Sequence, residues 1–298
     1  KKMTTKKDQD SKIVSSERRG FIKASAITAT TMGIGFVAAS EPVLAAAIET
    51  DFAGIKAGEQ MIPVGSFQLP AYVSRPEKAK GNLPIVIVVS EIFGVHEYIA
   101  DTCRRFAQAG YLAIAPDLYA RQGDAKSYTD IGKLIAEVVN KVPDAQVLSD
   151  LDATLKWAGA NGGNLDKTAI TGFCWGGRIT WLYSAHSKNV KAGVAWYGRL
   201  VGAPTAVNPK QPVELVASLK APVLGLYGGA DGGIPLTTIN EMKDALAAAK
   251  GNAAAKASEF VVYPTAPHAF HADYRASYRA APAADGWGRA LAWFKQHV

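Results

Sequence analysis

The stretch Thr171-Gly172-Phe173-Cys174-Trp175-Gly176-Gly177 has the form Gly-x-Cys-x-Gly and stands between a predicted strand (168–172) and a predicted helix (176–186). A nucleophile at a sharp strand-to-helix turn needs small residues two positions to either side, because the strand and the helix approach each other closely there. The helix N-terminus beneath Cys174 favours a thiolate, and the backbone N–H of Trp175 faces the place where an oxyanion develops. The stretch therefore predicts a nucleophilic cysteine at a strand–helix turn.

Two other interpretations of this stretch remain open on the sequence alone. Glycine-rich strand–helix turns also bind phosphate groups. Alternatively, Cys174 is a buried thiol in a tight turn or forms a disulfide bond with Cys103, the other of the chain's two cysteines, since an oxidising compartment permits such a bond. Cys103 falls within a predicted helix (98–109), away from the strand ends, so the nucleophile is favoured.

Strands and helices alternate along the chain on both sides of this turn. The predicted strands are 60–64, 66–74, 85–89, 111–115, 168–172, 190–197, 222–227 and 259–263, and the predicted helices are 98–109, 128–140, 144–160, 176–186, 236–249 and 285–297. Residues 85–89 are a continuous β-branched run, which is typical of a strand buried on both faces. The alternation predicts one α/β domain over 48–298, with a mostly parallel central sheet covered by helices on both faces.

The composition excludes several classes of protein. The 298 residues are 48% hydrophobic and 20% charged, which is ordinary for a globular protein. Two cysteines are too few for a disulfide-stapled scaffold, a zinc ribbon or an iron–sulfur protein. The sequence has no His-Glu-x-x-His, no Cys-x-x-Cys and no acidic cluster, so we expect neither a metal nor a cofactor.

Residues 1–47 have the pattern of an export signal. They hold eight basic and four acidic residues, so +4 of the net charge of +7 lies here and the remaining chain carries only +3. That remainder has no clustered basic helix, and we expect no binding to nucleic acid. A lysine-rich start is followed by the pair Arg18-Arg19, a mildly apolar run (24–39) and small residues at 43–47 that suit signal peptidase. The arginine pair followed by Phe-Ile-Lys resembles the twin-arginine (Tat) export signal of bacteria.

We therefore expect the Tat translocon to export the protein and residues 1–47 to be removed, which gives a periplasmic or secreted mature chain. The alternatives are an N-terminal membrane anchor and a flexible arm. The run 24–39 is rich in Ala, Thr and Gly and makes a weak membrane-spanning helix. No other stretch approaches the roughly 20 apolar residues that cross a bilayer, so we expect no stable membrane insertion after cleavage.

Two further residues follow the nucleophile in the order that α/β-hydrolases use, which is nucleophile, acid, histidine. Asp231 follows the predicted strand 222–227, and His268 follows the strand 259–263. Taken singly, each has an ordinary alternative as a turn aspartate or a solvated loop histidine. His271 is a nearby competitor but lies further into the loop. Three residues in the expected order, each just past a strand, predict a triad of Cys174, His268 and Asp231.

The loop after strand 85–89 contains a fourth candidate. It begins Ser-Glu-Ile-Phe-Gly, and in α/β-hydrolases this loop supplies the second oxyanion donor, here the N–H of Ile92 beside that of Trp175. Glu91 is unusual there, because a carboxylate would sit next to the developing negative charge. With a cysteine nucleophile, however, Glu91 can exchange a proton with the thiol.

Several stretches together resemble the dienelactone hydrolase family (carboxymethylenebutenolidases), and they span nearly the whole mature chain. They are Glu91-Ile92-Phe93-Gly94, Ala115-Pro116-Asp117-Leu118-Tyr119-Ala120-Arg121, Gly172-Phe173-Cys174-Trp175-Gly176-Gly177, Tyr197-Gly198, Asp231 and His268-Ala269-Phe270. The resemblance implies the α/β-hydrolase fold and a Cys174–His268–Asp231 triad. It also implies that Glu91 helps to ionise Cys174 when substrate displaces the carboxylate.

The residues that would choose the substrate match less well. The resemblance assigns substrate binding to Tyr119, Arg121, Tyr197 and Phe270. The muconate-pathway enzyme has an arginine where this chain has Ala272, although Arg275 is close by, and that enzyme lacks an export signal. We expect hydrolysis of a small-molecule lactone or carboxylic ester (dienelactone-type, 4-carboxymethylenebut-2-en-4-olide to maleylacetate) through a cysteine thioester. A carboxylesterase of broader specificity and a non-catalytic ligand-binding homologue are the alternatives.

Overall fold

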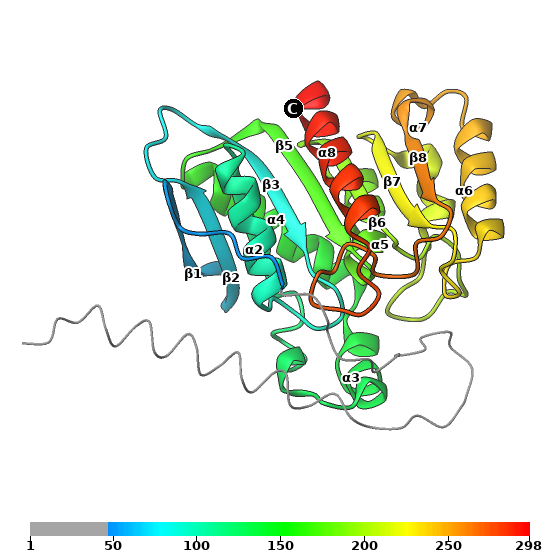
Figure 1. The fold of residues 1–298 in the computed structure, drawn as a ribbon, viewed down its shortest axis with the longest axis horizontal. Helices are drawn as coiled ribbons and strands as arrows, with labels where there is room; N and C mark the ends of the chain where they lie inside the picture. Colours follow the sequence, from blue (N-terminus) through cyan, green and yellow to red (C-terminus); the bar gives the residue numbers. More distant parts are fainter. Residues whose placement is uncertain (1–46) are drawn as a thin grey trace, which may run out of the picture.

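The computed structural model describes residues 47–298, whose strands form one eight-stranded sheet in the order β1-β2-β4-β3-β5-β6-β7-β8 (Figure 1). The strands are β1 (Ile55–Val64), β2 (Phe67–Pro76), β3 (Leu83–Val89), β4 (Leu112–Pro116), β5 (Gly163–Phe173), β6 (Val190–Trp196), β7 (Val223–Gly228) and β8 (Glu259–Tyr263). Strand β2 pairs antiparallel with β1 and β4, and every other neighbouring pair is parallel. The predicted mostly parallel sheet is thus confirmed. Except for residue 47, the predicted leader lies outside the described residues.

Helices cover both faces of the sheet, as predicted. The helices are α2 (Glu97–Gln108), α3 (Ile131–Glu137), α4 (Asp144–Ala160), α5 (Trp175–His186), α6 (Leu236–Ala248), α7 (Ala253–Ala257) and α8 (Ala280–His297), with short 3-10 turns at Ala125–Ser127, Val139–Lys141 and Pro212–Ser218. Helices α2 and α8 lie on one face, and α4 and α5 lie on the other (Figure 1). No helix in the described range 47–298 is long and apolar enough to span a membrane.

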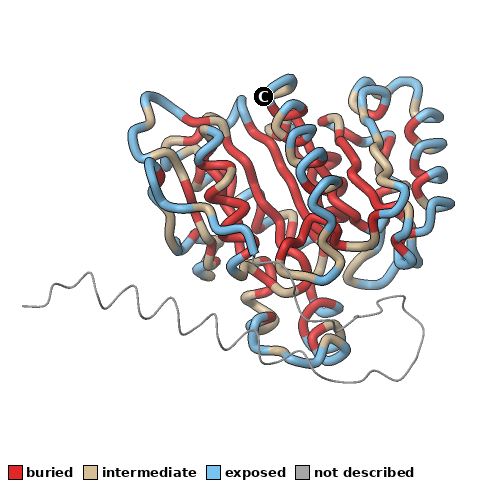
Figure 2. Tube along the Cα trace, viewed as in Figure 1, coloured by how far each residue is buried: buried red, intermediate tan, exposed pale blue. Residues whose placement is uncertain are grey.

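Strand β3 shows why the β-branched run forms the centre of the sheet. Val86 and Val88 pack in the core cluster that contains residues of α2 and α8, whereas Ile85 and Ile87 pack with residues of α4 and α5. All four are fully buried, and the central strands are buried along their length in Figure 2. Successive side chains of a strand point to opposite faces, so a strand covered on both faces is apolar at every position. Each such side chain stabilises the fold by about 1.5–3 kcal/mol.

Two helices differ from their predicted bounds for local reasons. The predicted helix 128–140 begins only at Ile131, because the Asp130 side chain caps it by accepting the Lys133 N–H over 3.0 Å. The last helix begins at Ala280 rather than at residue 285. It includes Pro282 in its first turn, where a missing N–H leaves no helical hydrogen bond unmade.

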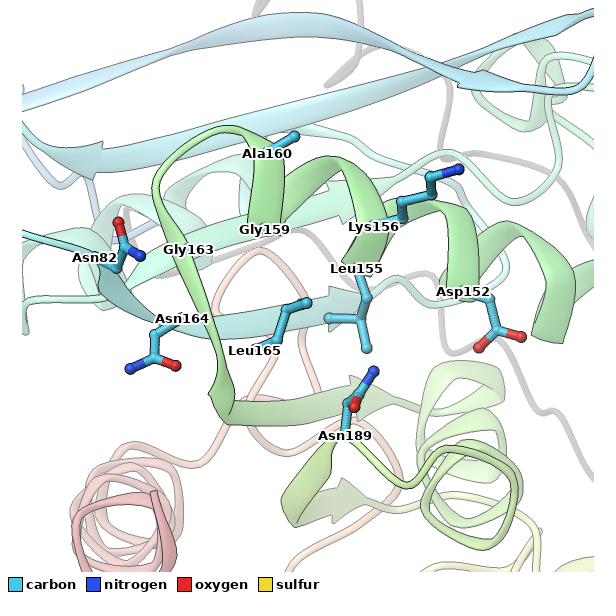
Figure 3. A pocket seen from close by; sticks show the side chains of 10 residues that line it. All are labelled: Asn82, Asp152, Leu155, Lys156, Gly159, Ala160, Gly163, Asn164, Leu165 and Asn189. Carbon is cyan, nitrogen blue, oxygen red and sulfur yellow. The ribbon is translucent and has the colours of Figure 1, made fainter.

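The parallel strands all end at the same edge of the sheet, where their arrowheads point in Figure 1. The loops after β3, β5, β7 and β8 at this edge carry the catalytic residues that the sequence predicts. A surface hollow of about 570 Å³ lies instead at the opposite edge, beside the start of β5 and the end of α4 (Figure 3). Its lining includes Asn82, Asn164 and Asn189 and none of the predicted catalytic residues, so this hollow is not the active site.

Candidate active site

Cys174 occupies the turn between β5 and α5. Its backbone has φ 57° and ψ −113°, a conformation that residues other than glycine rarely adopt. The Cys174 N–H donates to the Trp196 carbonyl over 3.0 Å, and the Gly177 N–H donates to the Cys174 carbonyl over 3.0 Å. These backbone bonds to β6 and α5 hold the strained turn in place. The structure therefore has the sharp strand–helix turn that the sequence predicts.

The two flanking glycines permit this turn because they leave room for neighbouring backbone. A Cβ atom on Gly172 would lie 2.1 Å from the carbonyl oxygen of Gly176. A Cβ atom on Gly176 would lie 2.3 Å from the carbonyl oxygen of Val89, at the end of β3. Side chains at either position would push α5 away from the sheet. The close approach of strand and helix predicted from the Gly-x-Cys-x-Gly pattern is thus what the structure contains.

Asp231 and His268 meet at the same edge of the sheet. Asp231 follows β7, and His268 lies in the connection between β8 and α8 (264–279), hereafter the histidine loop. The Nδ1 atom of His268 lies 2.7 Å from Oδ2 of Asp231. The other carboxylate oxygen accepts the N–H groups of Gly233 over 2.8 Å and Ile234 over 3.2 Å. With Nδ1 bound to this anchored carboxylate, Nε2 is the ring nitrogen left for chemistry.

His268 is also a neighbour of Cys174. Burial lowers the pKa of His268, but the charge of Cys174 and the hydrogen bond to Asp231 outweigh burial and raise that pKa to about 10. The imidazole is therefore a cation at neutral pH when a thiolate stands beside it. The His268 side chain is 19% exposed, so a small molecule can reach the ring. The three predicted triad residues are brought together.

The two predicted oxyanion donors lie just after the end of strand β3 and at the first residue of helix α5. Trp175 is the first residue of α5, and the first N–H groups of a helix have no acceptor within the helix. Ile92 lies in the loop after β3, and the carbonyls of Val89 and Ser90 in this region approach Gly176 closely. In the described part of the chain, neither the Trp175 N–H nor the Ile92 N–H forms a hydrogen bond. Both donors are thus available to a ligand.

Glu91 is buried beside this pair of amides and held by the histidine loop. It is 1% exposed, and the Tyr274 hydroxyl donates to its Oε2 over 2.6 Å. Within residues 47–298, its Oε1 has no hydrogen-bond partner. The His96 ring lies 3.9 Å from Oε2, but burial, Arg275 and Lys126 lower the pKa of His96 to about 3, so this histidine stays neutral beside the carboxylate.

Arg275 provides a positive charge in the site. Burial lowers the pKa of the guanidinium, but the charges of Glu91 and of other neighbouring groups together outweigh burial and raise that pKa. Cys174 and Tyr197 also lie close enough to act on it electrostatically. The guanidinium lies over the ring of Phe93 at 5.7 Å. Among the described residues it forms no direct ion pair within 4.0 Å, so its charge is not already taken up.

Of the four residues assigned to substrate binding, Tyr119 and Tyr197 lie against two of the predicted site residues, Trp175 and His268. The Tyr197 ring meets the His268 ring edge-on with centroids 5.2 Å apart. The Tyr119 ring packs on Trp175 at 4.8 Å. Burial, and then the charge of Cys174, raise the pKa of Tyr119, so its hydroxyl remains a neutral donor near the nucleophile.

The other two residues, Arg121 and Phe270, form contacts within the fold. Arg121 pairs with the buried carboxylate of Asp150 on α4, and its guanidinium lies 4.2 Å from the centre of the Phe67 ring. Phe270 is fully buried, and its ring packs against Tyr197 at 5.3 Å. Arg121 is thus already neutralised by the protein, and Phe270 supports the histidine loop from the core.

Sequence reasoning missed a buried hydrogen-bonded group behind the triad. The Tyr98 hydroxyl lies 2.6 Å from Nδ1 of His271, and both residues are buried. Burial and the charge of Arg105 lower the pKa of His271 to about 3, so its neutral ring accepts from Tyr98. Tyr197 lies close enough to Tyr98 for the two hydroxyls to influence each other electrostatically. His271, which the sequence left as a competitor of His268, is therefore part of the core.

The disulfide alternative is wrong. Cys103 and Cys174 are both free, and Cys103 is buried in α2, where burial raises the pKa of its thiol. In the range that the structure describes, no group of three or more His, Cys, Asp and Glu side chains could hold a metal ion.

A mostly parallel sheet with a cysteine at a strained strand–helix turn, and an aspartate and a histidine after later strands, has the architecture of an α/β-hydrolase. The chain belongs to the dienelactone hydrolase family, which matches residues 69–298. It is accordingly an enzyme of the carboxylic ester hydrolase class.

Three known proteins illustrate how close the similarity is. A protein of Methylorubrum extorquens named "Putative carboxymethylenebutenolidase" is 57% identical over 273 residues, which are 91% of this chain and 92% of that protein. A protein of Escherichia coli K12 with the same name is 53% identical over 269 residues, 90% of this chain and 97% of that protein. The crystal structure of a "Putative Dienelactone Hydrolase" from Klebsiella pneumoniae has a TM-score of 0.79 and 58% identity, and covers 82% of this chain and 99% of that one.

Proposed function

We propose that this enzyme hydrolyses a lactone or carboxylic ester through a covalent thioester on Cys174, with dienelactone-type lactones as its substrate class. The proposal rests on one observation: Cys174 stands at a strained strand–helix turn next to His268, whose other nitrogen is 2.7 Å from Asp231. A nucleophile, a base and a residue that orients the base are the parts that nucleophilic catalysis requires. The names of the relatives supply the substrate class.

In the first step, the Cys174 sulfur attacks the carbonyl carbon of the substrate. The carbonyl oxygen becomes an oxyanion, which the N–H groups of Trp175 and Ile92 stabilise. When this tetrahedral intermediate collapses, the bond from the carbon to the leaving oxygen breaks. His268 gives its Nε2 proton to that oxygen, and a thioester remains on Cys174. The raised pKa of His268 suits this role, because the ring starts the step protonated.

In the second step, water hydrolyses the thioester. The now neutral His268 takes a proton from the water as the oxygen attacks the same carbonyl carbon. The carbon–sulfur bond breaks, the carboxylic acid product leaves, and the thiolate and imidazolium are restored. Asp231 keeps the His268 ring in one orientation during both transfers.

We assign to Glu91 the exchange of a proton with Cys174 when substrate enters. Two observations support this assignment: Glu91 is buried at the site, and its Oε1 has no hydrogen-bond partner in the described range. Tyr274 holds only the other oxygen. A substrate group that moves the carboxylate therefore has one hydrogen bond to break.

Arg275 favours an anionic substrate within this class. Its guanidinium is half-buried near Cys174 and Glu91 and has no ion pair of its own among the described residues. A dienelactone carries a carboxylate in addition to the lactone ring, and a guanidinium binds a carboxylate in a fixed planar geometry. A neutral aryl ester offers Arg275 no such partner.

We also propose that the protein is exported by the Tat translocon and works in the periplasm or outside the cell as residues 48–298. The paired arginines at 18–19, the apolar run at 24–39 and the small residues at 43–47 support this proposal. Expression of the whole chain in a strain with and without the Tat translocon, followed by fractionation, tests it. Equal amounts of processed protein in both strains would contradict Tat export.

Turnover by the purified chain 48–298 tests the hydrolytic function. The substrates are cis- and trans-dienelactone beside neutral aryl esters, and Cys174→Ala is the matched variant. We expect hydrolysis of a dienelactone that the variant abolishes. Turnover of the aryl esters alone would favour the broader carboxylesterase, and no change in rate for Cys174→Ala would exclude the thioester. A chain that binds these compounds without turnover would be the non-catalytic homologue.

A further inference from the structure

The first described residues (47–53, hereafter the N-terminal segment) lie across helix α2 and reach the histidine loop (Figure 1). The Ile48 N–H points at Oδ2 of Asp273 at 3.3 Å, and the Thr50 N–H donates to Oδ1 of Asp101 over 2.6 Å. The backbone of this segment is therefore attached to one carboxylate of the histidine loop and to one of α2.

Asp273 shares its cation with another buried carboxylate. It is 2% exposed, and its Oδ2 accepts from Nη2 of Arg105 over 2.7 Å. Arg105 also donates from Nε to Oδ2 of Asp101 over 2.7 Å, so it serves two carboxylates. Arg104, the second cation, pairs with Asp101 and Glu97. Arg105 is thus shared by two buried carboxylates, Asp101 and Asp273, and a buried carboxylate is costly without a full partner.

The predicted end of the leader falls at the same place. The small residues at 43–47 suit signal peptidase, and the expected mature chain begins at Ile48. Ala47 and Ile48 are both exposed, so a protease can reach the bond between them. Hydrolysis adds water across this peptide bond and leaves a carboxylate on Ala47 and an amine on Ile48. An α-amino group has an ordinary pKa of about 8, so the amine takes up a proton at pH 7.

We propose that cleavage between Ala47 and Ile48 creates an α-ammonium group that forms an ion pair with Asp273 and becomes part of the folded enzyme. The Ile48 nitrogen already lies 3.3 Å from the carboxylate, so the pair forms without rearrangement of the segment. The new charge gives Asp273 a cation of its own beside the shared Arg105. The cleavage itself rests on the export signal proposed above, and the ion pair goes beyond the hydrolytic function.

The ion pair acts on the active site through the residue that follows Asp273. The Asp273 side chain contacts Arg105 of α2, whereas the Tyr274 hydroxyl holds Glu91 over 2.6 Å. Fixing Asp273 therefore fixes the part of the histidine loop from which Tyr274 reaches Glu91. The ammonium touches no reacting atom, and its role is to position this carboxylate.

Two purified chains that differ by one residue test the ion pair. One begins at Ile48 and the other at Ala47, and each is released without extra residues from an N-terminal fusion protein. In the longer chain the ammonium is displaced by one residue, about 3.8 Å along the backbone, and Ile48 keeps only an amide. We expect the chain that begins at Ile48 to have a Tm higher by roughly 2–4 °C. We also expect it to have a higher kcat on an aryl ester, with KM unchanged. Equal Tm values would overturn the proposal.

Asp273→Asn is the matched variant, because it keeps the size of the side chain and removes its charge. The Tm difference between the two N-termini should disappear in this background, and a difference that persists would assign the effect to another group. Acetylation of the Ile48 amine by an N-hydroxysuccinimide ester at pH 7, followed by mass spectrometry, provides a second readout. It should be slower in the wild-type chain than in Asp273→Asn, and equal rates would contradict the ion pair.

The cleavage is tested separately by sequencing the N-terminus of the protein recovered after export of the whole chain. Ile48 as the first residue supports the proposal. Any other first residue overturns the cleavage step, while the purified chains still decide whether an ammonium at Ile48 pairs with Asp273. Failure of the export signal and failure of the ion pair are therefore distinguishable.

Discussion

The hydroxyl of Tyr274 lies 2.6 Å from Oε2 of Glu91, although 183 residues separate the two in the sequence. This hydrogen bond joins the histidine loop, which carries His268, to the loop after β3, which carries the N–H of Ile92. Because Glu91 is almost completely buried, solvent cannot replace the donor that Tyr274 supplies. The position of the Glu91 carboxylate thus depends on a tyrosine contributed by the histidine loop.

Tyr274→Phe should therefore weaken both the fold and the chemistry. The substitution keeps the ring but leaves a buried carboxylate oxygen without its donor, which typically costs about 1–3 kcal/mol. We expect the free energy of unfolding in urea to fall by this amount and kcat to fall more than KM changes, because Glu91 is no longer held in one place.

Tyr278→Phe is the control for this prediction. Tyr278 lies on the same loop, and among the described residues its hydroxyl forms no side-chain hydrogen bond. We expect this variant to resemble the wild-type chain in both measurements. Similar losses in the two variants would mean that the histidine loop tolerates no such change anywhere, and Tyr274 would have no special part in holding Glu91.

Cys174→Ser should lower the pKa of His268. The charge of Cys174 is the largest cause that raises this pKa to about 10, and a serine hydroxyl is neutral at the same pH values. The bond to Asp231 should remain, so only part of the shift is lost. NMR titration of the His268 ring in the two chains measures the change directly. An unchanged pKa would show that Cys174 and His268 do not form the charged pair on which the mechanism depends.

Arg275→Gln should discriminate between anionic and neutral substrates. Removing the unpaired guanidinium takes away the partner of a substrate carboxylate, and hydrogen bonds to charged groups are worth about 1.5–3 kcal/mol. We expect kcat/KM for a dienelactone to fall by roughly 10- to 150-fold, whereas kcat/KM for a neutral aryl ester stays within about twofold of the wild type. Equal losses on both substrates would remove Arg275 from substrate recognition.

The places of the three candidate triad residues in the fold could be predicted from the sequence because each is set by a local feature. Cys174, Asp231 and His268 each come just after a strand, and parallel strands bring such positions to one edge whatever the details of packing. The buried partners could not be predicted in this way. Whether Tyr98 bonds to His271, or Tyr274 to Glu91, depends on side-chain directions in the folded core, and the sequence has no spacing that reports them.

Charged residues show the same limit. Arg121 follows a strand and falls in a stretch that resembles the family, so the sequence predicts that it binds substrate. Its ion pair with Asp150 depends on how α4 packs against the strand loops, and the sequence does not report that packing. In the sequence, Arg275 is only a charge close to His268. Its burial near Glu91 and Cys174 in the fold identifies it as a candidate contact for substrate.

Gly176→Ala should disrupt the site through backbone contact alone. Its Cβ would lie 2.3 Å from the Val89 carbonyl oxygen, so α5 must move away from β3 and take Cys174 with it. We expect a loss of activity together with a loss of stability of about 1–3 kcal/mol or more. Gly288→Ala on α8 is the control, because its Cβ meets nothing within 4 Å and alanine favours a helix by about 0.5–1 kcal/mol. If Gly176→Ala were as active and stable as Gly288→Ala, the close approach at the turn would not be required.

His271→Asn should make the fold more resistant to acid. Burial and Arg105 lower the pKa of His271 to about 3, whereas an unfolded histidine has a pKa near 6.5, so between these values only the unfolded chain binds the proton. Stability from this group is therefore complete above pH 6.5 and is lost as the pH falls, by about 2 kcal/mol at pH 5. Asparagine does not titrate, and its side-chain oxygen can still accept from Tyr98. We expect the free energy of unfolding to fall less between pH 7 and pH 5 in this variant than in the wild-type chain.

His186→Asn, which changes an exposed histidine beside Asp152, is the control and should show the same fall in the free energy of unfolding as the wild-type chain. If the decline were equally steep in His271→Asn and the wild type, His271 would not be the neutral buried acceptor described above.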